Sequence, residues 1–156
     1  MKLRRWIVAS LMAASLTSLT VGPSAINAAS NSEYVPRLGD IMNAVQARHI
    51  KLWFAGKSLN WDLAAFELAQ LRAGLVEAAV LYSGIPVSNV TTMADQIDAI
   101  SGAIEARDSK RFSKSFGELT QACNACHRSM DRGYIVMRMP DASPFSNQIF
   151  APQGKR

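Results

Sequence analysis

The most informative stretch of this chain is SKRFSKSFGELTQACNACHRSMDRG, residues 109–133. Apolar side chains recur in it every three or four residues, which is the spacing of one face of an α-helix. Asp108-Ser109 makes a short junction before the stripe, and Gly133 ends it. We therefore expect a helix over 109–132 whose buried face carries Phe112, Phe116, Leu119, Cys123, Cys126 and Met130.

Three similar stripes precede this one. Pro36 suits the first position of a helix that ends at Gly56 and carries Met42 and His49 on its apolar face. Asn60 can cap a second helix, which stops before the turn at 84–86. The sequence thus predicts two amphipathic helices before residue 87.

The third helix has a different start signal. Thr92 and Asp95 resemble a capping box, and the stripe that follows runs to Ile104. No alternating run of β-branched residues competes with helix before residue 133. Four helices with short connections predict an all-α fold, most simply an antiparallel four-helix bundle.

The two ends of the chain differ from its middle. Lys2, Arg4 and Arg5 precede an uncharged apolar stretch at 6–19, and small residues near Ala28 offer a cleavage point, so residues 1–28 read as a secretory signal peptide. An uncleaved membrane anchor is the rival interpretation. A membrane span needs about 20 apolar residues, and the stretch at 6–19 is shorter. Residues 29–132 then form the folded domain, exported to a bacterial periplasm and not stably inserted in the membrane.

Residues 133–156 form an extended tail in this prediction. Prolines 140, 144 and 152 exclude a long helix there. A disordered tail rarely carries many large apolar groups. We therefore expect the tail to pack along the bundle through Tyr134, Ile135, Phe145 and Phe150.

The composition is that of a folded domain and gives no sign of nucleic-acid binding. Hydrophobic residues make up 49% and charged residues 19%, as in a chain that folds around a core. Of 17 Lys and Arg, three lie in the expected signal peptide, which leaves 14 against 12 Asp and Glu. This near balance gives no electrostatic footprint for nucleic acid.

Both cysteines and one of the two histidines fall within Cys123-Asn124-Ala125-Cys126-His127. Cys-x-x-Cys-His is the attachment pattern of c-type haem. Two thiols three positions apart lie on one face of a helical turn, so they can bond covalently to one edge of a porphyrin. His127 then follows as the proximal iron ligand. Such attachment takes place outside the cytoplasm, in agreement with the signal peptide.

Other chemistry for the same cysteines must be weighed. A thioredoxin-type dithiol belongs at a junction between strand and helix, whereas this pair lies late in a helix. A zinc site needs a fourth ligand, for which only His49 or carboxylates remain. A disulfide across two intervening residues closes almost no loop and stabilises little. One covalently attached haem c is the interpretation that these considerations favour.

The position of the motif near the end of the chain, together with the predicted helices, points to a known family. A signal peptide, four helices and a carboxy-terminal Cys123–His127 motif resemble the class II c-type cytochromes, which comprise cytochrome c′ and its low-spin relatives of the cytochrome c-556 type. The resemblance covers about Leu38 to Arg132 and has one specific motif. The chain departs from the family in its long tail and in the segment Lys51–Gly56, which matches no function of that family.

The ligand on the other side of the iron is open at this stage. If the first and fourth helices are antiparallel neighbours, Met42 and His127 stand at nearly the same height. His49 lies about 10 Å further along the axis. By resemblance, Met42 falls where low-spin family members carry a distal methionine. His49 is the alternative ligand, and Met137, Met139 or an open distal site also stay possible.

Charge around the expected haem is asymmetric. The fourth helix carries an excess of positive charge, from Lys110, Arg111, Lys114, Arg128 and Arg132. These groups would steer an acidic redox partner, pair with the haem propionates, or form an ordinary solvated face.

The sequence thus predicts a monohaem carrier of single electrons rather than an enzyme, because peroxidase-type turnover needs a polar acid–base pair and one spare histidine is present. The expected partners are redox proteins, and homodimer formation is left open. The alternative is a five-coordinate, c′-like protein that binds nitric oxide or carbon monoxide.

Overall fold

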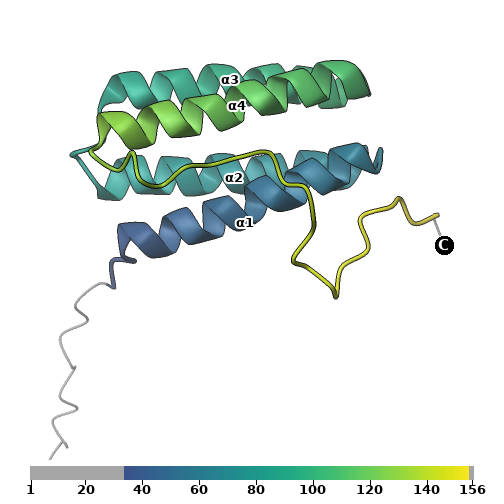
Figure 1. Cartoon of the computed structure of the whole chain (residues 1–156), viewed down its shortest axis with the longest axis horizontal. Coiled ribbons are helices and arrows are strands. Elements are labelled where there is room, and N and C mark those ends of the chain that lie inside the picture. The colour runs from purple at the N-terminus through teal and green to yellow at the C-terminus, as the bar shows by residue number, and fades with distance from the viewer. Residues whose placement is uncertain (1–33, 155–156) are drawn as a thin grey trace, which may run out of the picture. The chain divides into compact units, whose positions relative to one another are not determined.

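The computed structural model describes residues 34–154, and these form four α-helices and no strand. The all-α class is as expected. The helices are α1 (Leu38–Lys57), α2 (Trp61–Leu81), α3 (Val87–Glu105) and α4 (Ser109–Ser129). Successive helices run in alternating directions, and α1 begins at the end where α4 finishes (Figure 1). The expected signal peptide, residues 1–28, lies outside the described residues.

Two of the expected helix starts are confirmed by side-chain caps. The Asn60 carboxamide oxygen accepts a hydrogen bond from the Leu63 amide at 3.2 Å and so caps α2. The Asp108 carboxylate accepts from the amides of Lys110 and Arg111, each at 3.0 Å, and caps α4. Each cap satisfies amide groups that the first turn of a helix leaves without partners.

The expected start of α3 is wrong. The helix begins at Val87, five residues before the proposed cap at Thr92, which lies inside the helix. Pro86 occupies the cap position with φ −62° and ψ 139°, so its ring fixes the backbone without a side-chain hydrogen bond. The hydroxyl of Thr91 donates to the Val87 carbonyl at 3.2 Å, which shows how a threonine is accommodated within a helix.

Three helices are followed by a residue other than glycine in the left-handed conformation. Leu59, Arg107 and Asp131 adopt φ values of 58°, 51° and 56°, just after α1, α3 and α4. At α4 the Arg132 amide donates to the His127 carbonyl at 2.7 Å, and the Asp131 amide to the Arg128 carbonyl at 3.2 Å. This is the Schellman pattern. It ends α4 at Ser129, before the expected Gly133, and so places His127 in the last turn.

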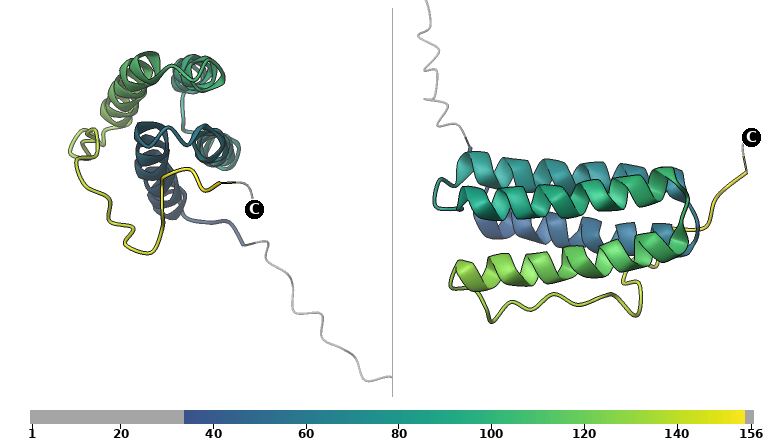
Figure 2. Two further views of the ribbon diagram at one scale, coloured as in Figure 1. Left: turned by 90° about the vertical axis from the view of Figure 1, so that its right-hand side faces the viewer. Right: turned by 90° about the horizontal axis from the view of Figure 1, so that it is seen from above.

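The helices pack unequally around one apolar core (Figure 2). The α1–α2 and α3–α4 pairs make the most extensive contacts, whereas α1 and α4 touch less than α2 and α3 do. An aromatic cluster of Trp53, Phe112 and Phe116 joins α1 to α4, with ring centroids 4.9 to 6.3 Å apart. Gly56 belongs to the same contact, because any side chain there would overlap the Phe112 ring. Close packing therefore accounts for most of the Lys51–Gly56 segment.

The tail returns along α4 and then passes to α1 (Figure 1). The Phe150 ring lies 5.7 Å from the Phe54 ring, and the Lys51 ammonium lies 4.6 Å from the Phe145 ring. The expectation is wrong for Tyr134 and Ile135, whose side chains are 78% and 45% exposed. The backbone of this part of the tail is held by polar groups of α4, and its side chains point to solvent.

No helix in the described part of the chain combines the length and apolar character that crossing a bilayer requires.

Candidate cofactor-attachment site

The last two turns of α4 carry Cys123, Cys126 and His127. Cys123 packs against the core, Cys126 is half-buried, and both thiols are free. Burial raises the pKa of Cys123 to about 12, with a further rise from the neighbouring Cys126, and burial also raises the pKa of Cys126. Reactive dithiols have the opposite property, a lowered pKa. The environment therefore argues against a thioredoxin-type role.

The zinc interpretation has no geometric support either. Within residues 34–154, no three side chains of His, Cys, Asp or Glu come together in a group that would hold a metal ion. His49 lies on the buried face of α1 and bonds to Thr120, two turns of α4 away from His127. The cysteines thus lack the additional ligands of a tetrahedral zinc site.

His127 has its ring oriented by the tail. Its Nδ1 lies 2.8 Å from the carbonyl oxygen of Ile135. A carbonyl only accepts hydrogen bonds, so Nδ1 is assigned the proton and Nε2 keeps its lone pair. Metal-bound histidines commonly have this arrangement, in which one ring nitrogen donates to a carbonyl and the other is available as a ligand.

The register of α1 against α4 follows from one buried contact. His49 Nε2 lies 2.9 Å from Thr120 Oγ1, so these two residues are level. Met42 precedes His49 by seven residues and His127 follows Thr120 by seven. Because the helices are antiparallel, each shift is about 10 Å in the same direction. Met42 and His127 therefore lie at the same level, and His49 lies about two turns away.

His49 is built as a core residue. It is 1% exposed, and its ring centroid lies 4.4 Å from that of Phe116. The Thr120 hydroxyl donates to the Phe116 carbonyl at 2.9 Å, so it accepts from His49 Nε2–H. Nδ1 is left as a buried acceptor without a partner among the described residues. Burial lowers the pKa of His49 to about 4, which keeps the ring neutral.

The part of the α1–α4 seam that is level with His127 has a simple composition. Within the described residues, no side-chain hydrogen bond, ion pair or aromatic pair links residues 38–48 of α1 to α4. Met42 and Cys123 are partly buried here against the core. Two thiols on one helical face, an available histidine Nε2 and a loosely joined apolar seam fit a covalently held haem.

The two methionines of the tail are placed elsewhere. The sulfur of Met139 lies 3.8 Å from where a side-chain carbon on Gly117 would stand. Gly117 precedes His127 by ten residues, a distance of about 15 Å along α4. Met137 is bound through its backbone to Asn124, on the side of α4 that faces the tail. Met139 is therefore far from the level of His127, and Met137 lies on the tail side of α4 rather than on α1.

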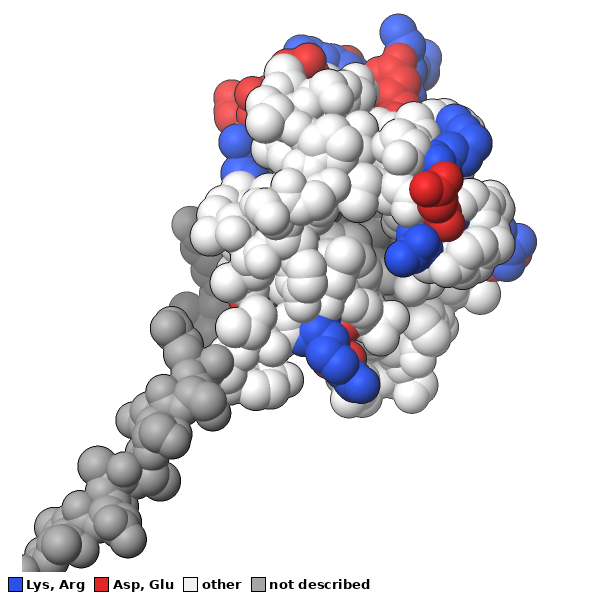
Figure 3. Space-filling model, turned by 90° about the vertical axis from the view of Figure 1, so that its left-hand side faces the viewer, with Lys and Arg blue, Asp and Glu red and all other residues white. Residues whose placement is uncertain are grey.

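The positive charge of α4 is mostly remote from the motif. Lys110, Arg111 and Lys114 occupy the start of the helix, and Lys114 lies about 20 Å from His127 along the axis. Only Arg128 and Arg132 are close to the cysteines. Figure 3 looks onto the end of the molecule where α4 finishes, and its centre is mostly uncharged and hollowed, with charged groups around the edge. Steering by a basic face beside the motif is therefore not favoured.

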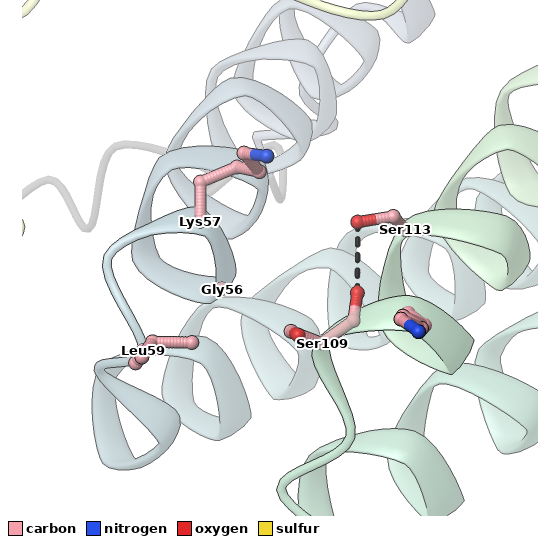
Figure 4. Close-up of a pocket in the computed structure, with 6 residues that line it drawn as sticks. Gly56, Lys57, Leu59, Ser109 and Ser113 are labelled. Carbon is pink, nitrogen blue, oxygen red and sulfur yellow. Dashed lines mark hydrogen bonds between the residues drawn. The ribbon is translucent and has the colours of Figure 1, made fainter.

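A cavity of about 510 Å³ lies at the opposite end, between the end of α1 and the start of α4 (Figure 4). In the α4 side of its wall, the hydroxyl of Ser113 donates a hydrogen bond to the Ser109 carbonyl at 2.8 Å. The cavity contains neither cysteine nor histidine and is separate from the attachment motif. Its lining residues are Gly56, Lys57, Leu59, Ser109, Lys110 and Ser113.

Comparison with known proteins gives no relative: no family model matches this sequence, and neither curated proteins nor solved structures give a significant match.

The sequence singled out the two cysteines and His127 as candidate site residues but gave no sign of the polar partners of the two histidines. Thr120, the partner of His49, gave no signal because a single threonine in a helix has no pattern. Asn124 and the carbonyl of Ile135 were missed because a tail without secondary structure has no periodicity to read.

Proposed function

We propose that this chain is a monohaem c-type cytochrome, an exported antiparallel four-helix bundle that carries single electrons. The observation that carries the proposal is the last turn of α4, where Cys123 and Cys126 precede a histidine whose Nδ1 is held by the Ile135 carbonyl. That bond leaves Nε2 of His127 available for iron. Bound haem supplies reversible one-electron chemistry, and the protein sets its potential through ligation and burial.

Each residue of the site has a distinct task in this proposal. The thiols of Cys123 and Cys126 anchor the cofactor covalently. His127 serves as proximal ligand. Met42, level with His127 on α1, would supply the second ligand to the iron and leave no open site for gases.

His49 has no place in the ligand set. It is two turns from the required level and its Nε2 is engaged by Thr120. The buried ring instead stabilises the contact between α1 and α4. A thioether opposite the histidine favours low-spin iron with a raised potential, which suits transfer of electrons between redox proteins.

The test is covalent attachment in the exported protein. The full-length chain is expressed in a bacterium that attaches haem c, and the purified protein is extracted with acidified acetone. We expect one haem per chain to stay with the protein, because thioether bonds survive this treatment. A Cys123→Ala/Cys126→Ala double variant is expected to retain none, and His49→Ala to retain it all. Free extraction of haem from the wild type would overturn the proposal.

A further inference from the structure

The first part of the tail is bound to α4 by one asparagine side chain. The Asn124 carboxamide donates from Nδ2 to the Met137 carbonyl at 2.9 Å and accepts at Oδ1 from the Met137 amide at 2.7 Å. Both polar groups of the side chain pair with both polar groups of one residue. Exchanging its oxygen and nitrogen would break both bonds, so the geometry fixes the assignment.

The carbonyl that His127 contacts lies between two fixed points. On one side, the Ile135 amide donates to the Arg132 carbonyl at 2.8 Å, within the turn that follows α4. On the other side, two residues further on, Met137 is held by Asn124. The Ile135 carbonyl oxygen is therefore restrained from both directions, as a hydrogen-bond acceptor for an oriented ring must be.

Asn124 and His127 share one face of α4, because residues three apart on a helix are neighbours. The tail runs in the opposite direction to the helix, so Asn124 meets Met137 while His127 meets Ile135. The side chains of Tyr134 and Ile135 contribute little, since both are exposed. The polar contacts of Asn124 and His127 thus define the position of this part of the tail on α4.

We propose that Asn124 is a positioning residue for the iron ligand: it locks the tail so that the Ile135 carbonyl orients the His127 ring, protonated at Nδ1 and open at Nε2. This inference rests on the proposed function. Hydrogen bonding at Nδ1 raises the basicity of the ligand nitrogen. The lock therefore strengthens the bond of His127 to iron and favours the oxidised state of the holoprotein.

The test compares two asparagines that bind the two ends of the tail. In Asn124→Ala the lock is lost. In Asn60→Asp the helix cap on Leu63 is kept, but the donor to the Phe150 carbonyl at 3.1 Å is removed. Both variants loosen the tail, and only the first acts beside His127.

Two measurements are made on the purified, reduced holoproteins by nuclear magnetic resonance, namely hydrogen exchange of the Met137 amide and of the His127 Nδ1–H. In Asn124→Ala we expect both protons to exchange roughly tenfold faster, as the loss of one or two hydrogen bonds implies. We also expect a higher reduction potential. Asn60→Asp is expected to leave all three quantities at the wild-type values.

A second variant guards against misfolding of the first. Met137→Pro removes the amide donor and leaves Asn124 intact, so it is expected to reproduce the faster exchange at His127 and the raised potential. Wild-type exchange at His127 Nδ1 in both variants would overturn the inference, and so would an equal effect of Asn60→Asp. The Met137 amide reports on the lock in protein without haem as well, so failure of the lock is distinguishable from absence of the cofactor.

Discussion

The two histidines of this chain occupy contrasting surroundings. His49 is 1% exposed, rests on Phe116 and bonds to a threonine hydroxyl, with Nδ1 left without a partner among the described residues. His127 lies in the last turn of a helix, where a backbone carbonyl of the tail holds Nδ1 and Nε2 makes no hydrogen bond to any other residue that the structure describes. Burial makes the first ring a neutral packing group. The second ring is oriented without being fully buried, as the proposed iron ligand would need to be.

The contact between α1 and α4 also differs between the level of His49 and the level of His127. Around His49 the helices are joined by aromatic rings and a buried hydrogen bond. Around His127 the seam is loose, and the order comes from polar contacts with the tail. We call the part of the seam formed by His49, Trp53, Phe116 and Thr120 the inner region. Substitutions in the inner region should change the free energy of unfolding. Substitutions near His127 should instead change the spectrum of the proposed haem.

The sharpest test of this division replaces, one at a time, the two residues of α1 that are candidates for the distal ligand of the proposed haem. Met42→Ala should convert the reduced holoprotein completely from low-spin to high-spin and allow rapid binding of carbon monoxide, because the level distal ligand is gone. His49→Ala should leave the visible spectrum unchanged while lowering stability. The opposite pattern would mean bis-histidine ligation and an incorrect register. A high-spin wild type would support the gas-binding alternative.

The inner region should be costly to truncate. Phe116 is fully buried and contacts both His49 and Trp53, so Phe116→Ala should lower the free energy of unfolding by about 3–5 kcal/mol in a denaturant titration. Val136→Ala, in the tail beside His127, is the matched control. Its side chain is 73% exposed, and the expected change is within about 0.5 kcal/mol. Equal losses would contradict the comparison.

Acid should weaken the inner region through His49. The lowered pKa, about 4 instead of 6.5, means that the unfolded chain binds the proton more tightly. Stability from the neutral ring is present above pH 6.5 and is lost as the pH falls from 6.5 to 4, by about 3 kcal/mol in total. Unfolding measured across this range should show the slope in the wild type. His49→Gln should flatten it, and an unchanged slope would remove His49 as the cause.

A smaller effect than that of Phe116→Ala is expected at the end of the molecule that holds His127. The Tyr82 hydroxyl donates to the Pro36 carbonyl at 2.7 Å and fastens the end of α2 to the start of α1. Tyr82→Phe should cost about 1 kcal/mol of stability, because the freed carbonyl can bond to water. The spectrum should not change. A loss comparable to that of Phe116→Ala would show that this end is as tightly packed as the inner region.

Local signals in the sequence determined a large part of the structure. The three- and four-residue spacing of apolar side chains predicted all four helices, Asn60 was the expected cap of α2, and the Asp108-Ser109 junction marked the start of α4. The Cys123–His127 motif depends only on residues within one helical turn. The helices and the cap at Asn60 could be predicted in this way because the interactions that create them are local.

Other features were decided only when distant segments met. The start of α3 at Val87 and the end of α4 at Ser129 depend on backbone turns that neither threonine nor glycine marked. The identity of His49 as a core residue required Thr120, 71 residues away. The orientation of His127 required a carbonyl from the tail, and the lock at Asn124 required Met137. Hydrogen bonds to the backbone use groups that every residue carries, so a sequence contains no record of which carbonyl a side chain will reach. That choice is made by the packing of the whole chain.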